Sequence, residues 1–111
     1  MEIENTHLDR EIHNALNEYI AHLYKKLDAN SWAGQRYSFE SEIGRKYIHV
    51  ILNTASQRSS HSWICLQDTA KFRRGTILKS ASWKTPATNF GRGDVFSPNT
   101  YENRADWTGV S

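Results

Sequence analysis

Apolar residues recur at three- and four-residue steps near the start of the chain. The series is Leu8, Ile12, Leu16, Tyr19, Leu23 and Leu27. This spacing places them on one face of a helix, with charged and polar residues on the other face. Thr6, with Asp9 three positions later, has the form of a capping arrangement, and basic residues in the last turn oppose the negative end of the helix dipole. The pattern predicts an amphipathic helix over about 7–28, which ends in the connection 30–34.

After the predicted helix, the period of the pattern changes from 3.6 to 2. Apolar side chains alternate with polar ones over residues 36–43, Gly44 supplies a turn, and residues 46–54 hold a β-branched run. This arrangement is typical of a β-hairpin. The segments that follow are a polar loop, a third strand, a charged loop and a fourth strand, at 55–60, 62–66, 71–75 and 76–83.

A helix followed by an antiparallel meander predicts an α+β fold in two layers. We expect the N-terminal helix to pack on one face of a sheet of three to four strands, over about 36–84, because each layer has an apolar face to bury. The other sheet face is expected to stay open to solvent or to a partner. Residues 87–111 lose the periodicity, which predicts an irregular tail whose apolar residues dock on the rest. All 111 residues fit a single domain.

Composition argues against several classes of protein. The longest apolar run, residues 50–52, is far below the ~20 residues that a membrane span needs, and the first residues lack the basic-then-apolar pattern of a signal peptide. The single cysteine, Cys65, is too few for an intrachain disulfide framework and suits a reducing compartment. We therefore expect a protein without membrane contact that stays in the cytoplasm.

The formal net charge of +2 conceals a division along the chain. Residues 1–57 carry six Lys and Arg against eight Asp and Glu, whereas residues 58–111 carry eight against four. The whole excess of positive charge therefore lies in the second half. It is smaller than that of a dedicated nucleic-acid binder, so it matters only if the fold gathers it on one face.

The residues that usually carry catalysis or bind metals are sparse. His49 and His61 lie near the ends of neighbouring predicted strands, but no cysteine or carboxylate is arranged around them to complete a metal site. Cys65 stands in an apolar strand, where burial makes a thiol inert. The serine and histidine cluster 59–62 lacks a motif that would position a nucleophile, and the turn 91–94 lacks the Lys-Ser/Thr of a phosphate-binding loop. We expect no cofactor, no metal and no enzymatic activity.

Aromatic and basic residues interleave in the second half of the chain. Rings that stack on bases, beside cations that contact phosphates, are the means by which proteins bind single-stranded nucleic acid. The candidate binding residues are Trp63, Arg73, Arg74, Lys79, Trp83, Lys84 and Arg92. On an extended strand Lys79 and Trp83 share one face, so they are expected to stand together. The alternative is that Trp63 and Trp83 are core residues under the helix and that the cations only hydrate the surface.

Three segments of this half, 62–68, 75–87 and 91–96, resemble the shared core of a widespread group of small tailed-bacteriophage proteins. That core looks like a strand ending in Asp, a Gly-Asp-Ile/Val-Leu/Tyr-Lys strand, an Ala-Ser-Trp-Lys-x-Pro-Ala segment and an Arg-Gly-Asn turn. The match covers about a third of the chain and is most specific at residues 82–86. It departs at Thr76, where the group has Asp, and at Asp94, where it has Asn. The resemblance implies a phage origin and the host-cell cytoplasm, and it implies no activity.

Two functions of different classes remain open from the sequence. The first is a non-enzymatic phage accessory protein that binds nucleic acid, with single-stranded nucleic acid favoured over duplex. The contact would be made by the face of the third and fourth strands and by the turn 84–93. The second is a stoichiometric inhibitor or modulator of a host protein, such as a defence or transcription component. The small size of the chain and its partly apolar tail favour this function as much as the first. The sequence leaves the oligomeric state open, with a homodimer among the alternatives.

Overall fold

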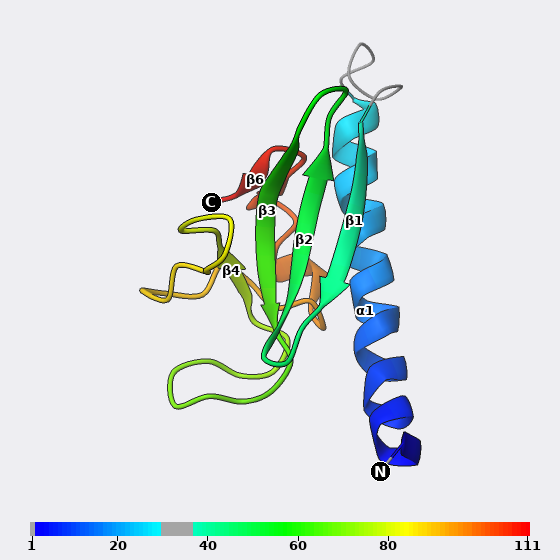
Figure 1. Ribbon diagram of the computed structural model, residues 1–111, viewed down its shortest axis with the longest axis vertical. Coiled ribbons are helices and arrows are strands. Elements are labelled where there is room, and N and C mark those ends of the chain that lie inside the picture. The colour runs from blue at the N-terminus through cyan, green and yellow to red at the C-terminus, as the bar shows by residue number, and fades with distance from the viewer. Residues whose placement is uncertain (1, 30–36) are drawn as a thin grey trace.

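The computed structural model describes residues 2–29 and 37–111, and for residues 2–9 it describes the backbone alone. The fold is α+β, as predicted, with one helix, a four-stranded antiparallel sheet and a second, two-stranded sheet in the described part (Figure 1). The elements are α1 (Glu2–Asp28), β1 (Ser38–Ile43), β2 (Tyr47–Asn53), β3 (Arg58–Cys65), β4 (Ile77–Lys79), the short 3-10 helix η1 (Pro98–Thr100), β5 (Ala105–Asp106) and β6 (Gly109–Val110).

Helix α1 ends at Asp28, as the periodicity predicts, but it begins at Glu2. Thr6 therefore lies inside the helix and is not its cap. Residues 2–28 contain neither Gly nor Pro, so no helix-breaking residue prevents the helix from extending back to Glu2. The predicted stripe is buried from Ile12 to Leu27, whereas the side chain of Leu8 and the predicted connection 30–34 lie outside the described residues.

The large sheet is the predicted meander, in which each strand pairs with the next along the chain. The start of the first predicted strand, Arg36, lies outside the described residues. β3 begins at Arg58, earlier than predicted, because a tight turn from Thr54 to Gln57 replaces most of the expected loop. β4 is shorter than predicted because a turn over residues 81–85 ends the pairing: the backbone N–H of Ala81 and that of Ser82 both donate to the carbonyl of Thr85.

A β-bulge between β2 and β3 decides which side chains face the helix. Val50 pairs with Ser62 and Ile51 pairs with Ser60, which leaves His61 without a cross-strand partner. The extra residue allows His61 and Ser62 to lie together on the helix side of the sheet. Ser60 and Trp63 lie on the opposite side, which we call the outer face.

The tail is mostly turns and irregular backbone, as its composition predicts, with η1 and the short strands β5 and β6 within it. Val95, Tyr101 and Val110 are buried in one core with α1 and the sheet, on the helix side (Figure 1). This burial stabilises the segment despite its weak local pattern. The predicted docking is confirmed for Val95 and Tyr101, whereas Phe90 and Phe96 are exposed.

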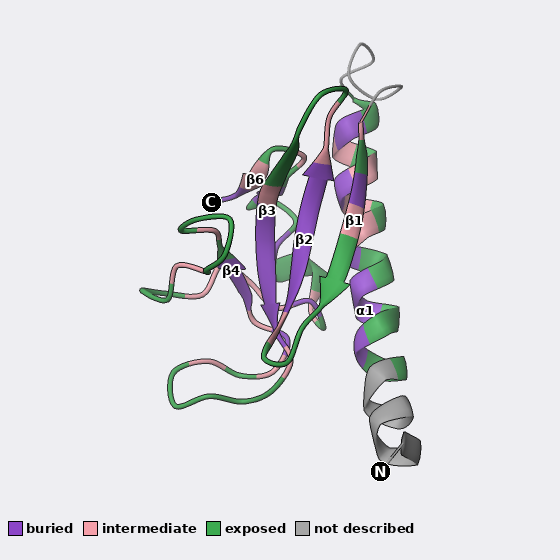
Figure 2. Ribbon diagram, viewed as in Figure 1, coloured by how far each residue is buried: buried purple, intermediate pink, exposed green. Residues whose placement is uncertain are grey.

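The outer face is only partly open to solvent, in contrast to the open face that the sequence predicts. Trp63, Cys65 and Leu78 are buried there in a second, smaller cluster, against which Tyr47 and Phe72 pack. β2 and β3 are buried along most of their length, while the last residues of β1 are exposed (Figure 2). Part of this face is therefore covered by its own loops, and part of it is hollowed.

Candidate functional site

The hollow on the outer face lies between the β1–β2 hairpin and the turn that follows β4. It is a pocket of about 350 Å³, which we call the outer-face pocket. The lining residues are Glu42, Ile43, Gly44, Tyr47, His49, Trp63, Trp83 and Lys84. Rings therefore form most of its wall, and one carboxylate and one ammonium group stand beside them.

The rings of this pocket hold one another in place. The imidazole of His49 stacks flat on the indole of Trp63, with ring centroids 3.8 Å apart and an interplanar angle of 5°. Trp83 meets His49 edge-on at 4.9 Å, and Tyr47 meets Trp63 edge-on at 6.0 Å. Trp63 is only 8% exposed, whereas Trp83 is 41% exposed. Trp63 thus forms the floor of the pocket and Trp83 forms an accessible wall.

A chain of hydrogen bonds fixes the tautomer of His49. The indole N–H of Trp63 donates to Ser80 Oγ over 2.9 Å, Ser80 and Ser60 share a hydrogen bond, and Ser60 Oγ lies 2.6 Å from Nε2 of His49. With Ser80 donating to Ser60 and Ser60 donating to Nε2, every hydroxyl hydrogen of this chain has an acceptor within the protein. This arrangement favours the neutral His49 that carries its proton on Nδ1.

Charges surround the rings. Arg58 bridges two carboxylates of β1, with Nη2 3.1 Å from Oε2 of Glu40 and 3.2 Å from Oε2 of Glu42. Its guanidinium carbon also lies 5.4 Å from the centroid of the Trp83 ring. The pKa of His49 is lowered, chiefly by burial; Glu42 raises it and Arg58 lowers it further. These effects together favour the neutral imidazole near pH 7.

The structure brings some of the predicted site residues together and separates others. Trp63, Trp83 and Lys84 line one pocket, although Trp63 is part of the small outer cluster. Lys79 lines a different pocket with residues 103–111 and does not stand with Trp83, because the strand ends at Lys79 and the chain turns. Arg73 is exposed on the loop between β3 and β4.

Four rings of the basic half each have a cation near them. Besides Arg58 on Trp83, the cation-to-centroid pairs are Arg92 on Phe90 at 3.8 Å, Arg74 on Phe96 at 5.1 Å and Lys71 on Phe72 at 5.8 Å. Arg74 also forms an ion pair with Glu11, at 3.4 Å. The side chain of Arg92 is partly buried, and its Nε has no hydrogen-bond partner. The predicted cations at 74 and 92 are therefore held against rings.

Five lining residues of the pocket are not among the predicted site residues: Glu42, Ile43, Gly44, Tyr47 and His49. In the sequence, His49 stands out only as a possible metal ligand. The available signal is the hairpin register, since His49 pairs with Trp63 on one side and with Glu42 on the other. Side chains that are directly opposite on neighbouring strands share a face, so Glu42, His49 and Trp63 form one row across the outer face.

The other chemical candidates stay apart from this pocket. His49 and His61 belong to neighbouring strands but lie on opposite faces of the sheet, so they do not form one site. Burial raises the pKa of the Cys65 thiol to about 11, in agreement with an inert core cysteine. Among the side chains that the structure describes, those of residues 10–29 and 37–111, no three His, Cys, Asp or Glu gather closely enough to hold a metal ion.

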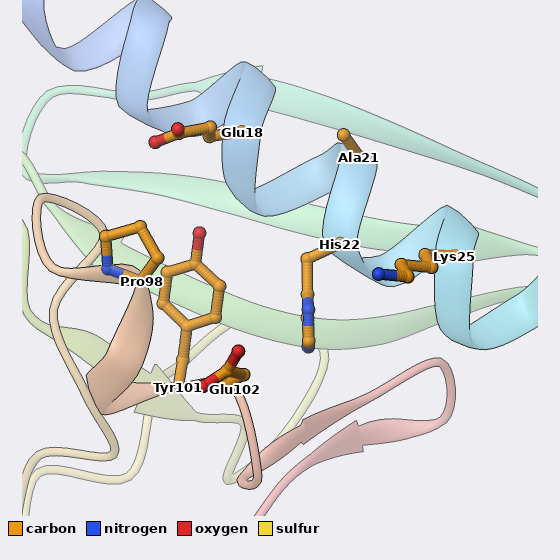
Figure 3. Close-up of a pocket in the computed structure, with 7 residues that line it drawn as sticks. All are labelled: Glu18, Ala21, His22, Lys25, Pro98, Tyr101 and Glu102. Carbon is orange, nitrogen blue, oxygen red and sulfur yellow. The ribbon is translucent and has the colours of Figure 1, made fainter.

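A second pocket, of about 260 Å³, lies on the helix side between α1 and the segment around η1. In Figure 3, Glu18, His22 and Lys25 of α1 face Tyr101 across it, with Pro98 and Glu102 nearby. Nε2 of His22 donates to the carbonyl of Ala105 over 2.9 Å, and its ring meets Tyr101 edge-on at 5.2 Å. These contacts tie the tail to the helix.

Comparison with known proteins assigns the chain to a family and gives no activity. Residues 2–111 match a family of unknown function (DUF7717), and the chain belongs to that family. No curated protein and no solved structure matches it. No helix in the described part of the chain is both long and apolar enough to cross a membrane.

Proposed function

We propose that this chain is a non-enzymatic binding protein that holds single-stranded nucleic acid. The contact surface would consist of the outer-face pocket, the loop 67–74 and the segment 80–96, which we call the basic aromatic surface. The observation that carries the proposal is the pairing of rings with cations on this surface. A ring with a cation beside it can stack on a base while the cation contacts the neighbouring phosphate.

The rings are accessible enough for this role. Trp83 is 41% exposed, Phe90 is 49% exposed and Phe96 is 39% exposed. Exposed rings of this size are costly to hydrate, and several of them close together are typical of a contact surface. Each stacked base is worth ~1–3 kcal/mol, so two or three rings supply useful affinity without sequence preference.

The charge of the surface also favours a polyanion. The basic aromatic surface contains five Lys and Arg against three acidic residues, Glu42, Asp68 and Asp94. Both aspartates serve the backbone: Asp68 Oδ1 accepts from the N–H of Arg74 over 2.8 Å, and Asp94 Oδ1 accepts from that of Phe96 over 2.9 Å. The surface therefore keeps a small excess of positive charge, which favours contact with phosphates.

The setting of the function is part of the same proposal. The resemblance of residues 82–86 to a core shared by small tailed-phage proteins supports a phage origin, and with it the host-cell cytoplasm. An accessory role during infection is consistent with a small binding protein.

The test is a fluorescence anisotropy titration of a labelled 12-nucleotide single strand, with the matching duplex, at 50 and 200 mM NaCl. We expect binding of the single strand at 50 mM salt, weaker binding at 200 mM, and a preference over duplex. Arg92→Ala should weaken binding, whereas Arg104→Ala, an exposed cation outside the basic aromatic surface, should not. No binding of the single strand at 50 mM salt contradicts the proposal.

The alternative, a modulator of a host protein, has its own support in Ile43, which is 52% exposed at the end of β1. An apolar side chain at the edge of a ring-lined pocket also suits a protein contact. Capture of one host protein from lysate that survives nuclease treatment, together with no binding of the 12-nucleotide strand, would favour this second function.

A further inference from the structure

We propose that the outer-face pocket takes a single unstacked nucleobase, with His49 and Glu42 hydrogen-bonding to its edge and Lys84 contacting the attached phosphate. This inference rests on the proposed function and deepens it, because it names the part of the nucleic acid that enters the pocket. The shape of the pocket, two hydrogen-bonding side chains on its wall and its charge support the assignment.

The pocket has the shape and the walls that a base requires. Its volume of about 350 Å³ is at the lower end of the range of small-molecule sites, which suits one nucleotide rather than a folded segment. Tyr47 and Trp83 are partly or well exposed, and the hydrogen bond from Trp63 to Ser80 locks the floor between them. A rigid aromatic site loses little conformational freedom when it binds a flat ligand.

His49 supplies a hydrogen-bond donor that has no partner in the protein. When Ser60 donates to Nε2, the proton of the neutral ring is on Nδ1. The residue is only 6% exposed and lines the pocket. An N–H on a pocket wall can donate to an acceptor of a ligand or to water. A ring nitrogen or a carbonyl oxygen of a base is such an acceptor.

Glu42 supplies the complementary acceptor. It lies directly opposite His49 in the hairpin register. Oε2 accepts from Arg58, which leaves Oε1 to accept from a ligand. Base edges place an N–H donor next to an acceptor, so a carboxylate beside an N–H matches them.

The charges favour a nucleotide over a cationic ligand. An aromatic pocket with one carboxylate also suits an alkylammonium group. Here, however, the guanidinium of Arg58 already lies over Trp83, so the ring face that a bound cation would use is occupied, and the one cation that lines the pocket is Lys84. A phosphate joined to the base would instead be attracted by Lys84.

The test compares a 12-nucleotide single strand with an abasic strand of the same length and charge, at 50 mM NaCl. We expect the abasic strand to bind at least tenfold more weakly, because it keeps the phosphates and loses the bases. In the same assay Trp83→Leu and Lys84→Ala should weaken binding of the normal strand, and Lys79→Ala, which removes an equal charge outside the pocket, should not. Equal affinity for both strands, or equal effects of Lys84→Ala and Lys79→Ala, overturns the inference.

A nucleotide titration separates the two proposals. Cytidine and adenosine monophosphates should quench the tryptophan fluorescence saturably in the unmodified protein and not in Trp83→Leu. If this occurs and no oligonucleotide binds, the pocket stands as a nucleotide site and the proposed function fails. If the normal strand binds more tightly than the abasic strand, and neither the monophosphates nor the Trp83→Leu and Lys84→Ala variants show a role for the pocket, the pocket inference fails and the proposed function stands.

The side-chain donor is tested with His49→Phe, which keeps a ring over Trp63 and removes Nδ1–H. We expect a loss of affinity for the normal strand and none for the abasic strand; equal losses for both would overturn the role of His49. This change also removes the acceptor of Ser60 and can unfold the chain. Trp83→Leu and Lys84→Ala alter exposed side chains, so they keep the test decisive in that case.

Discussion

The imidazole of His49 lies flat on the indole of Trp63, with the ring centroids 3.8 Å apart. The two residues are a cross-strand pair of β2 and β3, and hydrogen bonds to Ser60 and Ser80 hold their outer edges. The stack therefore exists before any ligand arrives. It makes the floor of the outer-face pocket part of the folding unit, so stability and binding depend on the same residues.

We expect the stack to contribute a measurable coupling free energy. In a double-mutant cycle of His49→Leu and Trp63→Leu, the coupling should be about 1 kcal/mol, since aromatic pairs are worth ~0.5–1.5 kcal/mol beyond the area they bury. The free energy of unfolding from urea titration measures it. A matched cycle of Phe39→Leu with Trp63→Leu joins residues on opposite faces of the sheet and should be additive. Equal coupling in both cycles would show that the stack has no special energy.

The sequence was sufficient for the layers of the fold and insufficient for the tail. The stripe from Ile12 to Leu27 and the alternation from Phe39 onward are local signals, and both appear as predicted. The tail has no such signal, because Val95, Tyr101 and Val110 are spaced irregularly and acquire order only by burial against residues distant in sequence. Tertiary packing of this kind is not visible in a local pattern.

The site was predictable only in part, because its composition depends on where β4 ends and on which residues pair across the strands. Trp63, Trp83 and Lys84 were identified from their chemistry, and the pocket contains all three. A strand that continued to residue 83 would place Lys79 and Trp83 on one face. The strand ends at Lys79, however, and the turn over 81–85 separates the two side chains. His49 enters the pocket through its register with Trp63, which a single sequence does not define.

Gly75 precedes β4 with a φ of +94°, in the region that favours glycine. A Cβ at this position would lie 2.6 Å from the ring of Phe96 and 2.9 Å from Asp94 Oδ1. Gly75→Ala should therefore lower the free energy of unfolding by at least ~1–3 kcal/mol, the cost of holding an ordinary residue in such a conformation. Chemical denaturation measures it. Gly44→Ala is the control, since its φ is not in this region and its Cβ meets only the carbonyl of Tyr47, at 3.2 Å; a loss as large at Gly44 would contradict the argument.

Arg58 and Trp63 should differ sharply in their effect on stability. The ion pairs of Arg58 with Glu40 and Glu42 are exposed, with the Arg58 side chain 47% accessible, so Arg58→Ala should change the free energy of unfolding only slightly. Trp63→Ala empties the small outer cluster and should cost about 3–5 kcal/mol. Thermal and urea unfolding of the two variants test this order. A larger loss for Arg58→Ala would mean that the charges, and not the rings, stabilise the outer face.

His61 should make the protein less stable at mildly acidic pH. Burial lowers its pKa to about 4, although the hydrogen bond to the carbonyl of Asp106 opposes the shift. Nε2–H donates to that carbonyl over 2.7 Å, and Nδ1 accepts from Ser62, which in turn accepts from Tyr19. Protonation of Nδ1 would therefore break the hydrogen bond from Ser62. The unfolded chain takes up this proton near pH 6.5 and the folded chain only near pH 4. The stabilisation is therefore complete above pH 6.5 and is lost as the pH falls toward 4.

The size of this loss follows from the difference between the two pKa values and is about 3 kcal/mol. Urea unfolding at half-unit steps from pH 7 to pH 4 measures it. The control is His61→Gln, which keeps a side-chain donor for Asp106 and does not titrate. Burial also lowers the pKa of His49, which adds a change of the same sign in both proteins. The difference between the two slopes isolates His61, and identical slopes for the unmodified protein and His61→Gln would show that the buried imidazole is not the acid-sensitive group.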